Sequence, residues 1–142
     1  MKKILGALSV ITVMLFCLTG CSLSNTLKCT GEKDGSKIEY IASLKGDTVT
    51  KVELNNEYTA ESEEDAKSTG ESLEEYLETI NEEISESGIS INSKVKGKKV
   101  ITNVKIDIEK VSESTLNKLF NDTELTKESF KEFAEDSGLT CK

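Results

Sequence analysis

The most reactive side chains in this 142-residue chain belong to four cysteines: Cys17, Cys21, Cys29 and Cys141. A cysteine thiol can take up a lipid, form a disulfide or bind a metal ion. The chain contains no histidine, so no imidazole is available as a general base or as a metal ligand. The position of each cysteine therefore decides which reaction it is suited to.

An apolar segment precedes the second cysteine. Two lysines follow Met1, and residues 4–18 are uncharged and mostly apolar. This segment is shorter than the roughly 20 residues that a membrane-spanning helix needs, and it is typical of a secretory signal peptide. We therefore expect residues 1–20 to be a signal peptide that is cleaved, and Cys17 to be removed with it.

The four residues Leu18-Thr19-Gly20-Cys21 follow this segment and have the form of a bacterial lipobox. The small Gly20 suits the active site of a protease that cleaves before Cys21, and the Cys21 thiol can form a thioether to diacylglycerol. We predict cleavage between Gly20 and Cys21 and lipidation of Cys21. The alternative is an ordinary secretory signal with a cysteine placed there by chance.

Lipidation at Cys21 would determine where the protein resides. Two acyl chains on one residue are enough for stable membrane anchoring. We therefore expect a protein anchored by palmitate-type lipid to the extracytoplasmic face of the cell membrane. Residues 21–27 would be the lipidated N-terminus and a short tether, and residues 28–142 a single domain.

Cys29 and Cys141 remain after processing, one near each end of the expected domain. An even pair of cysteines outside the cytoplasm is typical of a disulfide. By the chain-entropy argument, closing so long a loop contributes roughly 4–5 kcal/mol to stability. Two reduced, buried thiols are the alternative. A metal site is less favoured, because zinc takes four nitrogen or sulfur ligands and only two thiols are present.

The charge balance limits the partners. The formal net charge is −8, and it becomes −10 once Lys2 and Lys3 are removed with the signal peptide. Such an acidic domain is soluble and unsuited to nucleic acid or to an anionic bilayer. Membrane attachment is therefore expected to depend on the lipid alone.

Hydrophobic periodicity predicts the elements of the domain. Strand-like alternation begins at Leu27 and continues over residues 37–44, and a turn at Gly46 leads to a second strand that ends near Tyr58. Residues 62–87 have helical periodicity, with an apolar stripe at Leu73, Tyr76, Leu77, Ile80 and Ile84. Ser62 or Ser72 could begin this helix, and Gly70 could divide it.

A second hairpin follows, with its turn at Gly97 and a clean alternation over residues 100–108. A short helix is expected around residues 116–120, and a last helix from Thr126 to Gly138. The two hairpins show a weak internal repeat, which convergence between amphipathic hairpins would also explain. The predicted fold is α+β: an antiparallel sheet of about four strands, built from two hairpin–helix units with the helices packed on one face.

The chain resembles the YehR-like family of small bacterial lipoproteins. The resemblance lies in the lipobox, in the order of several short runs and in the positions of those runs along the chain. These runs are Lys28-Cys29-Thr30, residues 40–51 with Lys45-Gly46-Asp47, Glu63-Glu64-Asp65-Ala66, Ile106-Asp107-Ile108-Glu109, and residues 129–138 beginning Ser129-Phe130-Lys131. The resemblance implies a compact α+β domain of uncharacterised function. It supplies no catalytic residue.

Two charged regions are candidates for interaction. Residues 57–87 contain twelve carboxylates and one lysine, which would suit a basic partner or weakly bound divalent cations but is also typical of a solvated helix face. Lys94, Lys96, Lys98 and Lys99 surround the second turn and form a candidate interaction surface for anionic headgroups or wall polymers. An exposed turn whose lysines discourage edge pairing has the same composition.

No nucleophile motif or phosphate-binding loop is present, and we expect neither an enzyme nor a bound metal or cofactor. Tyr40, Tyr76, Phe120, Phe130 and Phe133 are expected in the core. The sequence favours a non-catalytic binding or envelope-interaction module whose protein or small-molecule partner it does not identify. A small-solute capture lipoprotein is the first alternative and a carboxylate-based hydrolase the second. A dry apolar cavity would favour capture, and a deep pocket with two close carboxylates would favour hydrolysis.

Overall fold

The computed structural model describes residues 25–83, 88–122 and 124–142. The predicted signal peptide, Gly20 and Cys21 lie outside these residues. The described elements are β1 (Asn25–Lys33), β2 (Ser36–Lys45), β3 (Thr48–Thr59), α2 (Glu63–Glu83), β4 (Ile89–Lys96), β5 (Lys99–Asp107), the 3-10 helix η1 (Ile108–Lys110), α3 (Glu113–Phe120), α4 (Lys127–Asp136) and β6 (Thr140–Cys141).

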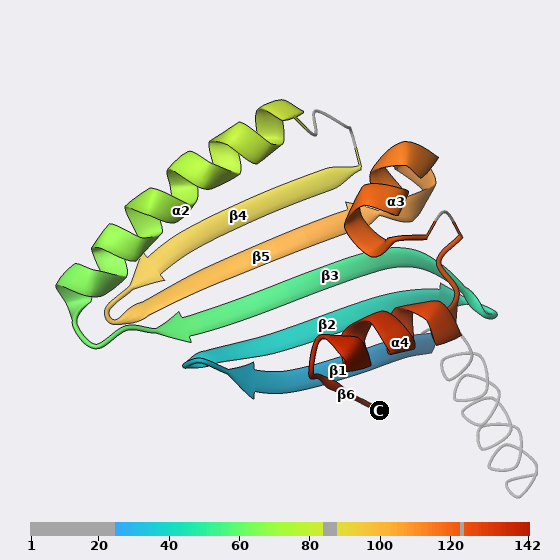
Figure 1. Cartoon of the computed structure of the whole chain (residues 1–142), viewed down its shortest axis with the longest axis horizontal. Helices are drawn as coiled ribbons and strands as arrows, with labels where there is room; N and C mark the ends of the chain where they lie inside the picture. Colours follow the sequence, from blue (N-terminus) through green and yellow to red (C-terminus); the bar gives the residue numbers. More distant parts are fainter. Residues whose placement is uncertain (1–24, 84–87, 123) are drawn as a thin grey trace, which may run out of the picture.

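The strands form one antiparallel sheet in the order β4-β5-β3-β2-β1-β6 (Figure 1). The predicted α+β class and antiparallel sheet are confirmed, but the sheet has six strands instead of about four. The two additional strands, β1 and β6, lie together at one edge. β1 begins at Asn25, so residues 25–27 belong to the sheet and not to the expected tether.

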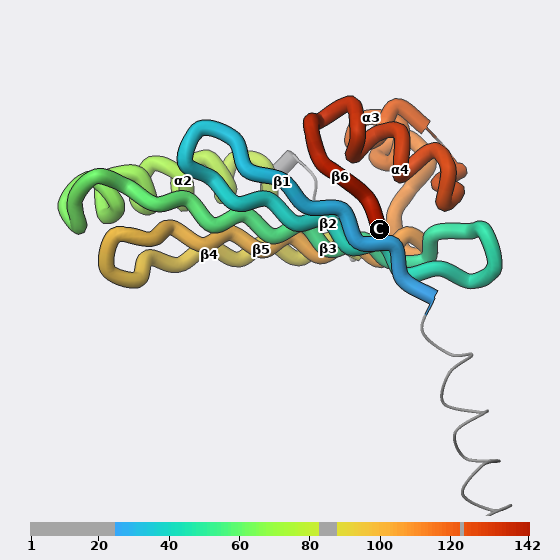
Figure 2. The backbone as a smooth tube through the Cα atoms, turned by 90° about the horizontal axis from the view of Figure 1, so that it is seen from below, coloured from blue at the N-terminus to red at the C-terminus, as the bar shows by residue number. Residues whose placement is uncertain are grey.

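The two faces of the sheet differ. Because side chains alternate along a strand, Tyr40, Leu54 and Val104 share one face, and their sequence neighbours Glu39, Asn55 and Asn103 share the other. Figure 2 shows α2, α3 and α4 on one side of the sheet, as predicted. We call this side the helix face. The other side is the open face, on which the described part of the chain places no helix.

The main core lies between the sheet and the two C-terminal helices. Phe130 of α4, Val49 and Val52 of β3 and Cys29 of β1 are its largest fully buried side chains. Phe133 lies beside them, with its ring centroid 5.3 Å from that of Phe120, 6.1 Å from that of Tyr40 and 6.4 Å from that of Phe130. Burial raises the pKa of Tyr40. The C-terminal helices are therefore anchored by a continuous aromatic cluster.

α2 is anchored more lightly, by a small cluster of the buried residues Ala60, Ala66 and Val100. It is one continuous helix through Gly70. Ser62 caps its start, since the Asp65 N–H donates to Ser62 Oγ over 3.0 Å and the Ser62 hydroxyl donates to Asp65 Oδ2 over 2.6 Å. The helix therefore begins at the earlier of the two expected positions.

Tyr76 of α2 is not a core residue, and its predicted burial is wrong. Its side chain is 62% exposed. The residues of α2 that face the sheet are Ala66, Gly70 and Leu73, and at 100° per residue Tyr76 lies to one side of that stripe. The apolar ring of Tyr76 is therefore exposed at the surface.

The two hairpin turns and the start of α4 form at the residues where the sequence predicts them. Gly46 and Gly97 have φ values of +65° and +58° in the two predicted hairpin turns. Thr126 begins α4 with a capping box, in which the Ser129 N–H donates to Thr126 Oγ1 over 3.1 Å and the Thr126 N–H donates to Ser129 Oγ over 2.9 Å.

Candidate binding surfaces

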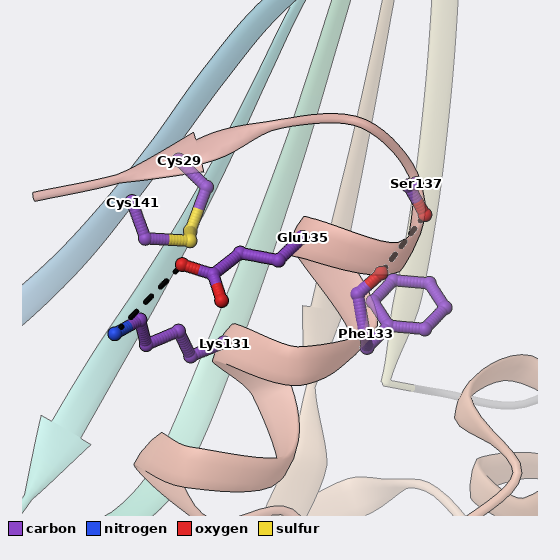
Figure 3. The surroundings of a disulfide bond; sticks show 6 residues. All are labelled: Cys29, Lys131, Phe133, Glu135, Ser137 and Cys141. Atoms are coloured by element: carbon purple, nitrogen blue, oxygen red, sulfur yellow. Dashed lines mark hydrogen bonds and ion pairs between the residues drawn. A yellow bond between two sulfur atoms is a disulfide. The ribbon is translucent and has the colours of Figure 1, made fainter.

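Cys29 and Cys141 are paired directly across β1 and β6 and are joined by a disulfide (Figure 3), so the predicted pairing is present in the structure. α4 lies over this pair, and its Lys131 and Glu135 side chains form an ion pair at 3.7 Å. Cys29 is fully buried. Two thiols bonded to each other are not available as metal ligands, which removes the metal alternative for these two residues.

A row of polar side chains crosses the open face. The residues directly opposite one another on successive strands are Thr30, Glu39, Asn55, Asn103 and Asn92, from β1, β2, β3, β5 and β4. We call these five residues the polar row. Three asparagines in one row are unusual for a sheet, since asparagine is disfavoured in strands. The open face therefore carries residues that strand propensity alone would not select.

Hydrogen bonds hold the centre of this row in place. The Asn103 amide donates to Asn55 Oδ1 over 2.5 Å and to Glu53 Oε1 over 2.9 Å, and the Asn55 amide donates to Glu39 Oε1 over 3.4 Å. Lys28 Nζ lies 2.5 Å from Glu39 Oε2. The Lys28 ammonium, by hydrogen bonding and by its charge, lowers the pKa of Glu39. The row is therefore ordered before any partner arrives.

Two shallow hollows flank the polar row on the open face. The larger, about 660 Å³, is lined by Thr30, Gly31, Glu32, Lys37, Ile38, Glu39, Asn55, Asn56, Glu57 and Ile101. The smaller, about 310 Å³, lies on the other side of the row, between the first half of β3, the end of β5 and the start of β4, and Ile41 contributes to its lining. Each hollow combines charged side chains with an isoleucine. Such broad, open depressions suit contact with a large polar partner better than enclosure of a small molecule.

The four lysines of the predicted interaction surface do not form one free cluster. Lys98 Nζ donates to the Glu61 carbonyl over 3.0 Å, and Lys99 Nζ pairs with Glu57 Oε1 at 2.7 Å, which lowers the pKa of Glu57. Lys98 therefore joins the hairpin to the segment just before α2, and Lys99 joins β5 to β3. Lys94 and Lys96, on the open face of the edge strand β4, have no polar partner among the described residues.

Charge is divided between the two faces of the molecule. α2 carries nine carboxylates and one lysine. The open face carries seven lysines and five carboxylates: Lys28, Lys37, Lys51, Lys94, Lys96, Lys99 and Lys105, against Glu32, Glu39, Glu53, Glu57 and Asp107. An acidic protein therefore presents a mildly basic face, and total composition could not reveal this division.

A third hollow, of about 260 Å³, lies on the helix face between α2 and the sheet. It is lined by Ser36, Asn56, Tyr58, Thr69, Leu73, Val100 and Thr102, and we call it the helix-face groove. Thr69 and Leu73 lie on the same flank of α2 as Tyr76, so the exposed ring of Tyr76 borders the groove. The apolar stripe in the sequence predicts that this flank of α2 is buried, but in the structure Tyr76 on this flank is exposed.

Within residues 25–83, 88–122 and 124–142, no group of three or more aspartates, glutamates or cysteines is placed to hold a metal ion. None of the helices among these residues is long and apolar enough to cross a membrane. On the open face, Glu39, Glu53 and Glu57 each have a lysine or asparagine partner. The lysine partners of Glu39 and Glu57 lower the pKa of both carboxyls, and a carboxyl with a lowered pKa is poorly suited to act as a general acid.

Comparison with protein-family models finds no match, and comparison with curated proteins finds none either. The fold is shared with two solved structures. One is the NMR structure of the YehR protein of E. coli, which is 22% identical, with 83% of this chain and 90% of that chain covered and a TM-score of 0.61. The other is the NMR structure of a protein from Streptococcus pneumoniae TIGR4, which is 14% identical, with 83% and 86% covered and a TM-score of 0.56. The chain therefore has a YehR-like fold.

Proposed function

We propose that this chain is a YehR-like lipoprotein, anchored through Cys21 to the extracytoplasmic face of the cell membrane, and that it acts as a non-catalytic binding module of the envelope. Its binding surface is the open face of the sheet. The observation that carries the proposal is the hydrogen-bonded polar row, which is ordered and lies on a face free of described helices. A preordered surface loses little side-chain entropy when a partner binds.

The open face suits a polar macromolecular partner. Asparagine side chains offer both donors and acceptors, and the flanking lysines add positive charge. Ile41 and Ile101 supply small apolar contacts within an otherwise polar surface. The chain lacks histidine entirely, and the half-buried carboxylates of the face are paired, which is why the proposal contains no catalytic step.

The position of the tether would orient this surface. Asn25 pairs with Leu44 at one end of the sheet, and the turn around Gly97 adjoins Thr59 at the other end. Ten residues of β3 separate these ends, which is about 30 Å at the rise of a strand. A chain anchored just before Asn25 would hold the lysine turn away from its own bilayer, so the open face would meet partners in the envelope and not lipid headgroups.

Anchoring and binding can be tested separately in intact cells. The parent protein should incorporate labelled palmitate and remain in the membrane fraction through extraction with salt, whereas Cys21→Ala protein should incorporate none. A parent protein that carries no label at its N-terminal peptide would contradict the anchoring part of the proposal.

Binding can be mapped by placing a photo-crosslinking residue at Asn92 on the open face and, as a control, at Glu132 on α4. Both positions are exposed. Adducts are expected from Asn92 and not from Glu132, and Thr30→Val, which changes the exposed end of the polar row, should reduce them. Equal adducts from both positions, or adducts from Glu132 alone, would show that the open face is not the binding surface.

A further inference from the structure

The helix-face groove contains more exposed apolar surface than a closed core would leave. Tyr76 is 62% exposed at its border, and Leu73, Tyr58 and Thr102 line it without being fully buried. Exposed apolar surface of this kind marks a place where a partner could add contacts.

One side of the groove is formed by an acidic helix, α2. α2, on one side, carries eight more carboxylates than lysines, and α4, over the opposite part of the same sheet face, carries two more. Figure 1 shows α2 running beside β4, while α4 lies over β1 and β2. A partner that enters the groove therefore meets a negative potential from α2.

Apolar surface beside an acidic helix matches one chemical class of partner. We infer that the helix-face groove binds a cationic amphipathic peptide segment, whose apolar side chains contact Tyr76 and Leu73 and whose basic groups face the carboxylates of α2. Recognition of this kind joins burial of apolar side chains with charge complementarity at the rim. It uses the face opposite the polar row and does not depend on the proposed role of that row.

The absence of tryptophan from the chain provides a simple measurement. The probe is a lysine–leucine peptide of about 14 residues, roughly 21 Å long as a helix, with leucines at i, i+3 and i+4 and one tryptophan. The mature lipidated protein is held in nanodiscs of neutral phosphatidylcholine, and the signal from empty nanodiscs is subtracted. Binding should shift the tryptophan emission to the blue. A peptide of the same composition in scrambled order, and one with glutamate in place of lysine, should bind at least about tenfold more weakly.

Tyr76→Ser tests the apolar contact. Because Tyr76 is exposed, the variant should fold normally, which circular dichroism would check, and it should bind the peptide about fivefold to tenfold more weakly. Asn117→Ala, at an exposed position of α3 outside the groove and the polar row, is the matched control and should leave the affinity unchanged.

The electrostatic part is tested by Glu75→Gln with Glu82→Gln, two exposed positions on α2. This pair should weaken binding about threefold to tenfold and reduce its dependence on salt concentration. Glu32→Gln with Glu109→Gln removes the same charge elsewhere and should have a smaller effect.

Three results would overturn the inference. They are equal binding of the acidic peptide, unchanged affinity in Tyr76→Ser, and self-association of the protein that protects Tyr76 without any peptide. Self-association of this kind would mean that a second copy of the chain occupies the groove. None of these results would change the crosslinked adducts expected at Asn92. Failure of the peptide-binding inference can therefore be distinguished from failure of the proposed function.

Discussion

Gly70 of α2 lies so close to Val95 of β4 that a Cβ atom at position 70 would overlap the Cγ2 methyl of Val95. This contact sets the distance between the acidic helix and the edge strand. The glycine is retained inside a helix, where it is less favourable than alanine by about 1 kcal/mol. Close packing against β4, and not helix propensity, therefore explains why a glycine occupies this position.

Gly70→Ala should destabilise the protein by about 1–3 kcal/mol, because overlap with Val95 outweighs the gain in helix propensity. The free energy of unfolding in urea measures the effect. The same substitution in a Val95→Ala background should instead be neutral or stabilising by up to about 1 kcal/mol, since the obstructing methyl is gone. If Gly70→Ala destabilises both backgrounds equally, Val95 is not the cause.

Loss of the disulfide should lower stability by about 2–5 kcal/mol, because the bond constrains the unfolded chain across a separation of 112 residues. Urea unfolding of the double variant Cys29→Ala, Cys141→Ala would measure this against the parent protein. A reductant should destabilise the parent protein and have no effect on the double variant. Full thiol labelling of the unreduced parent protein at both cysteines would show that the bond does not form.

The ion pair between Lys28 and Glu39 predicts a pH dependence of stability. The pKa of Glu39 is lowered from its ordinary value of 4.5, chiefly by the hydrogen bond from Lys28. A carboxylate with a lowered pKa stabilises the fold above its unfolded pKa, and this contribution is lost as the pH falls through the folded pKa. Lys28→Met should therefore raise the pKa of Glu39, and its stability deficit should shrink below about pH 4.5.

NMR titration of the Glu39 carboxyl would measure this shift directly. Lys67→Met, which removes the partner of the exposed pair Lys67–Glu71 at 4.0 Å, is the control and should leave the Glu39 titration unchanged. A Glu39 titration that is the same in Lys28→Met and in the parent protein would show that Lys28 does not set this pKa.

The longer strands and helices could be predicted because their apolar residues recur with the period of a strand or of a helix. Val100, Thr102, Val104 and Ile106 alternate along β5, and the glycines of both hairpins mark the turns. The disulfide could be predicted from the number and location of the cysteines. β1 starts with polar residues and β6 has only two, so their signals are too short or too weak to add two strands to the expected sheet.

The candidate surfaces were harder to predict because they depend on neighbours far apart in sequence. Asn55 and Asn103 are 48 residues apart, and only the pairing of β3 with β5 places them side by side. Tyr76 fits the apolar stripe of its helix, yet that helix packs through Ala66 and Gly70 and leaves the ring outside. In both cases the missing information is how the elements are positioned, which local periodicity does not contain.

The polar row also restricts how the strands can align. If β5 slid past β3 by one residue, Asn103 would turn toward Phe133 and the aromatic cluster, and Val104 would turn into water. Every slip of β5 by an odd number of residues would therefore bury an unsatisfied amide in an apolar layer. The same side chains that could meet a partner thus penalise such slipped pairings during folding, and they favour alignments that keep the two faces of the sheet as they are.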